Sequence, residues 1–197
     1  MNRTITALLL ALSSSVNAQQ FITKTYTIAP HTSLEGADLS GEDLSNLNLS
    51  FCNLVRANLS GAVLHGANLE GTIMEGANLE GANLEGANLS NAQLIDTNFL
   101  GTNLSGVKFS HSSLTYANLI QVNLTNADLS STDLRSADLF DSNLLSANLE
   151  GASLTNPNLF DAKLTCLKGC PLDLPEDYIC ESDLDCEEQD RFRIVEE

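Results

Sequence analysis

The chain carries a large apolar residue at every fifth position from Leu34 to Leu164, twenty-seven times without interruption. Leu fills most of these central positions, and Phe or Met fills the others. A period of five fits neither an α-helix, whose apolar stripe recurs at about 3.6 residues, nor a flat strand, whose faces alternate every two. The chain must therefore change direction once in every repeat.

The flanking positions of each repeat are restricted as well, as in Gly76-Ala77-Asn78-Leu79-Glu80. The residue two before the centre is small, and the residue two after it is often Gly or Asn, which suit a corner with positive φ. If both the small residue and the centre point inward, each repeat forms one side of a square coil of twenty residues. Stacked about 4.8 Å apart, such coils predict an all-β rod roughly 33 Å long. Residues 33–165 would make nearly seven coils.

The central side chains are expected to fill the interior of this rod. Cys52 stands at an inward position normally filled by Ala, which predicts a buried and unreactive thiol. Glu42 and Leu47 depart from the small-residue rule in the first coil only. The residues that we single out as structural core are Leu79, Leu84, Leu89, Phe99, Phe109 and Leu129.

The consensus Ala, then Asp or Asn, then Leu and two variable residues resembles that of the pentapeptide repeat proteins. It covers about 135 of the 197 residues, for example Asn126-Ala127-Asp128-Leu129-Ser130. The resemblance implies a right-handed quadrilateral β-helix. The competing interpretation, an amphipathic or coiled-coil helix, would need a period of 3.5 or 3.6 residues that is absent.

The N-terminal residues 1–18 have the pattern of a secretory signal peptide. Arg3 precedes an apolar stretch at residues 5–12, and small residues lead to a cleavage site after Ala18. A short buried strand or helix is the alternative. The apolar stretch is too short to span a bilayer, and no later segment reaches the required length of about 20 residues. The sequence thus predicts a secreted or periplasmic protein without stable membrane insertion, whose residues 19–32 form an N-terminal cap containing one strand.

Residues 166–197 form an acidic tail with four of the five cysteines, Cys166, Cys170, Cys180 and Cys186. In an exported protein an even cysteine cluster indicates disulfides, and three pairings are open. The segment from Cys170 to Cys180 resembles a terminal element of other exported pentapeptide repeat proteins, which favours Cys170 with Cys180 and Cys166 with Cys186. We interpret the tail as a disulfide-stapled cap. A four-cysteine zinc site is the alternative, although paired C-x-x-C knuckles are missing.

The net charge of −17 is distributed over both the repeats and the tail. Such a polyanion repels nucleic acid and anionic membranes. Glu70, Glu75, Glu80 and Glu85 are spaced by five, so each falls on a different side of a coil, and the three histidines fall in different coils. Residues 181–188 are rich in carboxylates but lack the glycine and the oxygen spacing of a calcium loop. No catalytic, metal-binding or cofactor-binding residue is predicted.

These observations predict an exported, non-enzymatic rigid scaffold for protein–protein interaction or for a structural role in the envelope. Its partner protein and its oligomeric state are left open. The alternative is a DNA-mimicking topoisomerase inhibitor or protector, which the family resemblance and the acidic rod favour and the export signal disfavours. A hydrolase or lyase would need a cluster of carboxylates at twenty-residue spacing on one side, and we predict none.

Overall fold

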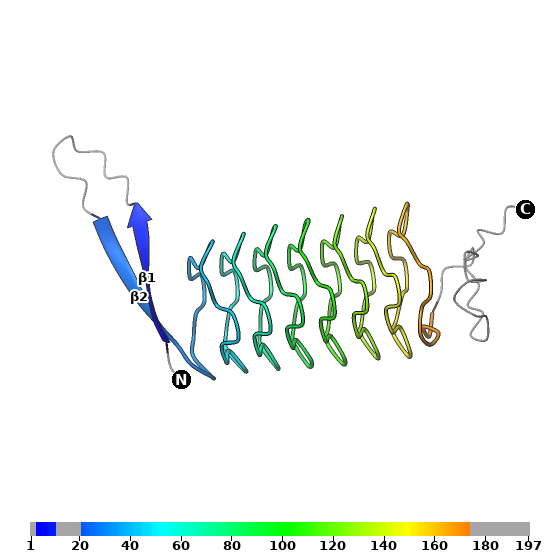
Figure 1. Cartoon of the computed structure of the whole chain (residues 1–197), viewed down its shortest axis with the longest axis horizontal. Coiled ribbons are helices and arrows are strands. Elements are labelled where there is room, and N and C mark those ends of the chain that lie inside the picture. Colours follow the sequence, from blue (N-terminus) through cyan, green and yellow to red (C-terminus); the bar gives the residue numbers. More distant parts are fainter. Residues whose placement is uncertain (1–2, 11–20, 174–197) are drawn as a thin grey trace, which may run out of the picture.

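The computed structural model describes residues 3–10 and 21–173. Strand β1 (Arg3–Leu10) pairs with strand β2 (Phe21–Ile28) in an antiparallel two-stranded sheet, in which Arg3 faces Ile28 and Leu10 faces Phe21. This sheet lies at one end of a rod of stacked coils, and β2 leads directly into the first coil (Figure 1).

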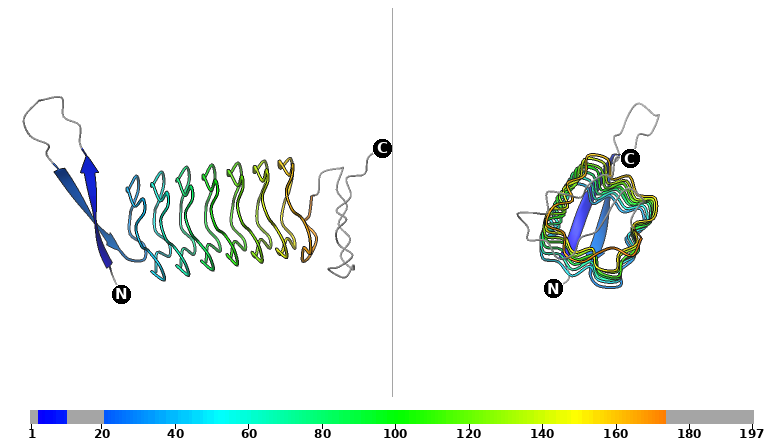
Figure 2. Two further views of the ribbon diagram at one scale, coloured as in Figure 1. Left: turned by 45° about the horizontal axis from the view of Figure 1, so that its top comes forward. Right: turned by 90° about the vertical axis from the view of Figure 1, so that its right-hand side faces the viewer.

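The rod is a parallel solenoid in which each coil pairs with the next through isolated bridges. The bridged residues are always twenty apart, from Ser33 with Asn53 to Ser153 with Asp173. Twenty residues are four repeats, so each repeat supplies one side of the coil. Viewed along the axis, the coils superimpose on a four-sided outline (Figure 2). The pairing distance equals the coil length that the five-residue period predicts.

Backbone hydrogen bonds explain why the chain turns once per repeat. Leu79 N donates to Asn98 O in the following coil at 2.7 Å, and Ala82 N donates back to Leu79 O at 3.0 Å to close a β-turn. The third residue of this turn, Gly81, has φ +64°. Within the described residues, seventeen that are not glycine, including Phe51 and Tyr116, also have φ between 52° and 61°. The sequence predicts this conformation only for Gly and Asn corners; bonds between coils, such as Tyr116 N to Arg135 O at 3.2 Å, hold the other residues in it.

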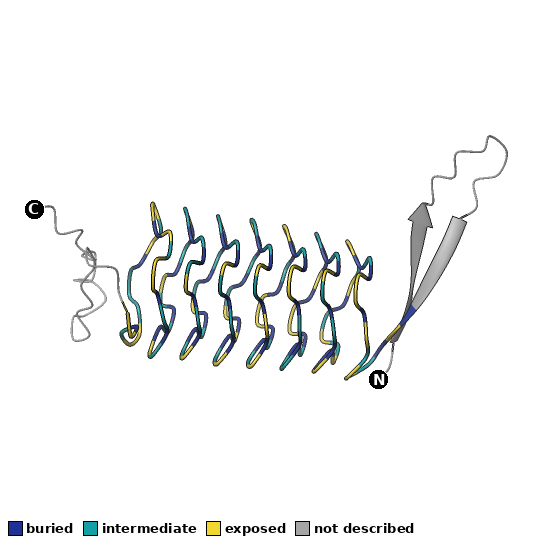
Figure 3. Ribbon diagram, turned by 180° about the vertical axis from the view of Figure 1, so that it is seen from behind, coloured by how far each residue is buried: buried dark blue, intermediate teal, exposed yellow. Residues whose placement is uncertain are grey.

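Buried residues recur in every coil along the rod (Figure 3), and they belong to one core cluster. The side chains of Leu79, Leu84, Leu89, Phe99, Phe109 and Leu129 all have 0% exposure. Phe99 and Phe109 meet edge to face, with ring centroids 6.0 Å apart and an interplanar angle of 84°. Glu42 and Leu47, which depart from the small-residue rule in the first coil, are only partly buried. The core is thus a stack of large central residues separated by small ones.

The N-terminal end of this core is joined by the last residues of β2. Tyr26 and Ile28 are buried in the same cluster as Leu34. Cys52 Sγ donates to Ala29 O at 3.1 Å, which ties the connecting segment to the second coil. The strand expected within residues 19–32 is therefore β2. Strand β1 lies inside residues 1–18, and the removal of that segment as a signal peptide stays a prediction.

At the other end, the ladder continues beyond the boundary at residue 165 that the sequence predicts. Leu149 N donates to Lys168 O, and Lys168 N donates to Ala147 O, both at 2.8 Å. These bonds need only backbone groups, so the ladder tolerates Gly169 at the next central position. Leu172 N then donates to Ala152 O at 2.7 Å, one residue earlier than the pattern would place the donor. The donor is thus displaced by one residue next to Pro171, while Ser153 and Asp173 still pair twenty residues apart.

The cysteines fall into two groups. Cys52 is a buried free thiol, whereas Cys166 and Cys170 are disulfide-bonded. Cys180 and Cys186 lie outside the described residues, as do the rest of the tail cap and the acidic segment 181–188, so the predicted pairing stays a prediction. Within the described part of the chain there is no helix of the length and apolar character needed to cross a membrane.

Candidate interaction surface

The outer surface of the rod consists of columns of residues twenty positions apart. We name the four sides by their central residues: side A begins at Leu34, side B at Leu39, side C at Leu44 and side D at Leu49. On each side, the residues just before and just after the centre point outward.

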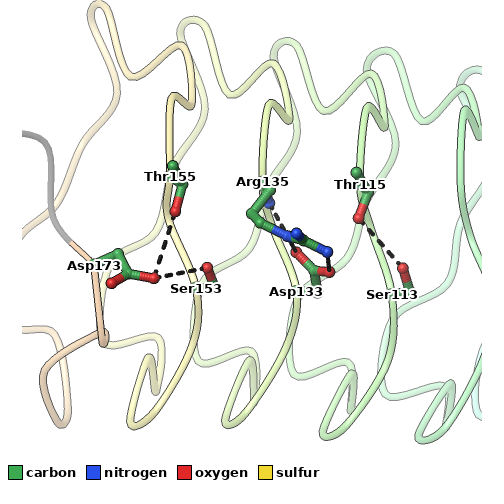
Figure 4. Close-up of polar contacts among 7 residues, drawn as sticks. All are labelled: Ser113, Thr115, Asp133, Arg135, Ser153, Thr155 and Asp173. Carbon is green, nitrogen blue, oxygen red and sulfur yellow. Dashed lines mark hydrogen bonds and ion pairs between the residues drawn. The ribbon is translucent and has the colours of Figure 1, made fainter.

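Side A is a polar face in the C-terminal half of the rod. Its two outward columns carry short polar side chains that bond to one another (Figure 4). Asp173 accepts hydrogen bonds from Ser153 at 3.1 Å and from Thr155 at 3.4 Å. Figure 4 shows three separate groups of such contacts: Ser113 with Thr115, Asp133 with Arg135, and Ser153 and Thr155 with Asp173.

One ion pair stands in the middle of side A. Arg135 Nε and a terminal guanidinium nitrogen donate to the two carboxylate oxygens of Asp133 at 2.8 and 2.6 Å. The hydrogen bond from the Arg135 side chain lowers the pKa of Asp133 against a smaller opposing effect of burial. Because the Arg135 side chain is 58% exposed, water screens this attraction. The guanidinium group of Arg135 is therefore paired with Asp133.

Sides B, C and D carry ladders of Asn and Asp next to the central Leu. On side B, Asn118 Nδ2 donates to Asn98 Oδ1, and Asn98 Nδ2 donates to Asn78 Oδ1, both at 2.9 Å. Each Oδ1 also accepts the backbone N–H two residues later, for instance that of Leu100 at 3.1 Å. Every ladder amide thus fixes both its own side and the neighbouring coil. The surface that these ladders carry is rigid because local motion would break both kinds of bond.

Side B also bears a run of apolar residues just after the centres. We call Leu100, Ile120, Phe140 and Phe160 the apolar column. All four are at least partly exposed, and Phe160 has 66% exposure. The rings of Phe140 and Phe160 stack with centroids 5.9 Å apart and an interplanar angle of 5°. None of its members is among the residues predicted from the sequence, although their twenty-residue spacing is present there.

The groups that the sequence analysis judged unable to form a site are dispersed in the structure. Glu70, Glu75, Glu80 and Glu85 lie one on each of the four sides. No group of three or more metal-ligating side chains forms within residues 3–10 and 21–173. His31 stacks on Phe51 with ring centroids 5.1 Å apart, remote in sequence from His65 and His111.

The buried thiol of Cys52 is the remaining candidate for chemistry. Burial raises the pKa of this thiol, and hydrogen bonds with the backbone of Thr32 and His31 oppose the shift less strongly. The raised pKa keeps the group protonated near neutral pH, and the protonated thiol is a poor nucleophile. The geometry therefore offers extended, rigid faces, side A polar and side B partly apolar, which are suited to contact with another molecule.

Comparisons with known proteins point to one family. A family model described as pentapeptide repeats matches eight copies, over residues 43–81, 73–110, 102–139 and 132–165. These matches together cover more than half of the chain.

Solved structures of similar proteins carry the same repeat. HetL, a pentapeptide repeat protein involved in heterocyst differentiation regulation from the cyanobacterium Nostoc, is 26% identical over 72% of this chain and 86% of its own, with a TM-score of 0.33. A pentapeptide repeat protein from the Arabidopsis thaliana thylakoid lumen is 29% identical over 58% of this chain and 70% of its own, with a TM-score of 0.30. QnrB1, a plasmid-mediated fluoroquinolone resistance protein, is 20% identical over 72% and 79%, with a TM-score of 0.42. A search of curated proteins gave no match.

Proposed function

Because the chain belongs to the pentapeptide repeat family, we propose that it is an exported, non-enzymatic rigid scaffold that binds another protein. In this proposal it is a right-handed quadrilateral β-helix of nearly seven coils, closed at its C-terminal end by a disulfide-stapled cap. The single observation that carries the proposal is the uninterrupted core. Every large central residue from Leu34 to Leu164 is buried, so the repeats leave only their outward columns for function.

The outward columns support binding rather than catalysis. They are extended, and the Asn ladders hold them with bonds such as Asn123 Nδ2 to Asn103 Oδ1 at 3.2 Å. A rigid surface loses little conformational entropy when a partner binds, which favours affinity. A catalytic site would instead need several reactive groups that converge on one cleft.

Affinity capture tests the scaffold function. The chain beginning at Gln19 would be immobilised and exposed to an extract of its source, with an unrelated acidic protein of similar net charge as control. We expect a partner that is retained by the scaffold, saturates with concentration and is absent from the control. Retention of the same proteins by both matrices, or by neither, would contradict the proposal.

Export is tested separately by the N-terminal sequence of the protein isolated from its source. Processing after Ala18 predicts a mature chain that begins with Gln19 and is found outside the cytoplasm. An intact N-terminus beginning at Met1 in the cytoplasmic fraction would remove the export part of the proposal and leave the scaffold part standing.

The acidic coils favour one alternative, a DNA-mimicking inhibitor or protector of topoisomerases. Between His31 and Thr165 there are fifteen acidic and four basic residues, so the rod presents a strongly negative surface. A gyrase supercoiling assay with the purified chain decides this alternative. Inhibition or protection at micromolar concentration would support it, and the absence of both would exclude it.

A further inference from the structure

We propose that the apolar column of side B is the docking site of this scaffold for a protein segment that carries apolar side chains beside Lys or Arg. The inference rests on the proposed scaffold function and names both the surface and the chemistry of the partner. Four large apolar residues, Leu100, Ile120, Phe140 and Phe160, follow one another in this column; the first three are partly exposed and Phe160 is exposed.

The fold itself does not require apolar residues in this column. The same column in the earlier coils holds Ser40, Ser60 and Glu80, which lie in equivalent positions on side B. The equivalent columns on the other three sides never hold two apolar residues in succession. The core beneath is complete in both halves of the rod, so the switch from polar to apolar at Leu100 changes only the surface.

The apolar column is held rigidly before any partner arrives. The backbone N–H of each member donates to the Asn or Asp two residues earlier, at 3.1 Å for Leu100, Ile120 and Phe140 and 3.2 Å for Phe160. The stacked rings of Phe140 and Phe160 support each other across two coils. Preorganised aromatic side chains are effective anchors in protein interfaces because little entropy is lost on binding.

The charges beside the column select the partner. Asp141 and Asp161 occupy the adjoining corner with positive φ, and Asp138 lies on the other flank in the Asn ladder. Asp141 accepts a hydrogen bond from Gln121 at 3.2 Å, and Asp138 accepts one from Asn158 at 2.8 Å. Within the described residues none of these three carboxylates forms an ion pair. Lys163, two residues after Asp161, lies beyond ion-pair distance of it.

These three aspartates favour a basic partner over two other molecules that could cover the apolar column, namely a second copy of the chain and the chain's own residues 174–197. A second copy would bring its own row of aspartates against the first, and like charges at an interface are unfavourable. Residues 174–197 contain ten acidic and two basic residues, so this segment would be repelled as well. At about 4.8 Å per coil the column extends roughly 14 Å, a length that a short peptide segment covers.

Binding of defined peptides to the chain from Gln19 to Glu197 tests the proposal. The probes are an amphipathic peptide with Leu and Phe beside Lys, the same peptide with Glu in place of Lys, and a scrambled basic peptide of equal charge. Two double variants of the protein are compared with the parent. The first is Phe140→Ser with Phe160→Ser, which introduces the residue found at the equivalent positions Ser40 and Ser60. The second is Asp141→Asn with Asp161→Asn. Leu145→Ser is the matched control, since Leu145 is 38% exposed on side C, outside the column.

The proposal expects the basic amphipathic peptide to bind best. The double Phe variant should lose at least about tenfold in affinity, and the double Asp variant about threefold or more. Leu145→Ser should bind like the parent, and circular dichroism should show that all variants are folded. Equal binding by the Phe variant, no binding to the parent, or preference for the scrambled or acidic peptide would overturn the proposal.

Two further measurements test whether a second copy of the chain or residues 174–197 cover the apolar column instead. Self-association in sedimentation that disappears with the Phe substitutions would identify a second copy as the occupant and overturn the proposal. Peptide binding that appears only after residues 174–197 are removed would identify that segment instead. If capture from the source extract persists with the double Phe variant, the scaffold function stands and this inference fails; if nothing is captured by either protein, the scaffold function itself fails.

Discussion

Among individual side chains, the buried hydroxyl groups differ in whether they have a hydrogen-bond partner. Ser112 Oγ donates to Phe109 O at 2.6 Å, whereas Ser142 Oγ is buried without a partner. Both occupy the inward position that Ala fills in most repeats. We predict that Ser142→Ala raises the free energy of unfolding by about 1 kcal/mol, because it removes an unsatisfied polar group.

The matched substitution Ser112→Ala should act in the opposite direction. It removes a hydrogen bond and is expected to lower the free energy of unfolding by about 1 kcal/mol. Urea unfolding followed by circular dichroism measures both variants against the parent. A loss of stability in Ser142→Ala would show that its hydroxyl has a partner, such as a buried water molecule.

At the corners, the structure separates two costs of replacing a glycine. Gly71 and Gly81 have φ of +63° and +64°, so Ala at either position must adopt the left-handed region. A Cβ at Gly71 would clash with the ring of Phe51, whereas a Cβ at Gly81 would meet nothing within 4 Å. We predict that Gly81→Ala lowers the free energy of unfolding by roughly 1 kcal/mol and that Gly71→Ala lowers it further.

A double-mutant cycle isolates the contact at this corner. In a Phe51→Ala background the two glycine substitutions should cost the same, since only the backbone conformation then matters. Thermal unfolding of the six proteins gives the comparison. If Gly71→Ala lowers the stability of the parent no more than Gly81→Ala does, the Phe51 ring, which is 51% exposed, moves aside without a loss of stability.

The N-terminal strand supplies a testable contribution to the first coil. Tyr26 is 7% exposed, Ile28 is 1% exposed, and both lie in the core cluster. Removal of residues 1–18 takes away β1 but leaves these two side chains in place. We predict that a chain beginning at residue 29 loses about 2–4 kcal/mol relative to one beginning at residue 19, because two large side chains no longer cover the core.

Hydrogen exchange would locate that loss. Protection should fall mainly for the first-coil amides, including His31 N, which donates to Ser50 O at 3.0 Å. The chain from residue 19 is the control, and its coils should exchange like those of the full-length chain. Equal urea midpoints for the two truncated chains would mean that β2 does not stabilise the solenoid.

For the molecule as a whole, the sequence predicts the coil well because one period determines both the turn frequency and the inward positions. Leu79 and Phe109 are buried as the pattern requires. Three features escape such reading. Non-glycine corners such as Tyr116 depend on hydrogen bonds to the next coil, the ladder beyond residue 165 depends on backbone groups alone, and the apolar column appears only when residues twenty apart are compared.

The same stacking predicts how damage spreads along the rod. Each coil contacts only its neighbours, so stability is a sum of local terms between adjacent coils. Phe99 is fully buried against Phe109 near the middle of the rod. We predict that Phe99→Ala lowers the free energy of unfolding by about 3–5 kcal/mol, because it leaves a large cavity. Phe99→Leu introduces Leu, which fills all the other central positions of side B from Leu39 to Leu159, and should lower the free energy of unfolding by less.

Hydrogen exchange of these two variants distinguishes local from global loss. In Phe99→Ala, protection should fall most for the coils that contain Phe99 and its neighbours at Leu79 and Leu119, and least for the coils near Leu39 and Leu159, because the intervening interfaces are intact. Phe99→Leu should show the same profile with smaller amplitude. A uniform loss of protection from the first coil to the last would instead mean that the rod unfolds as one cooperative unit. The rigidity of the apolar column would then depend on the packing of all the coils.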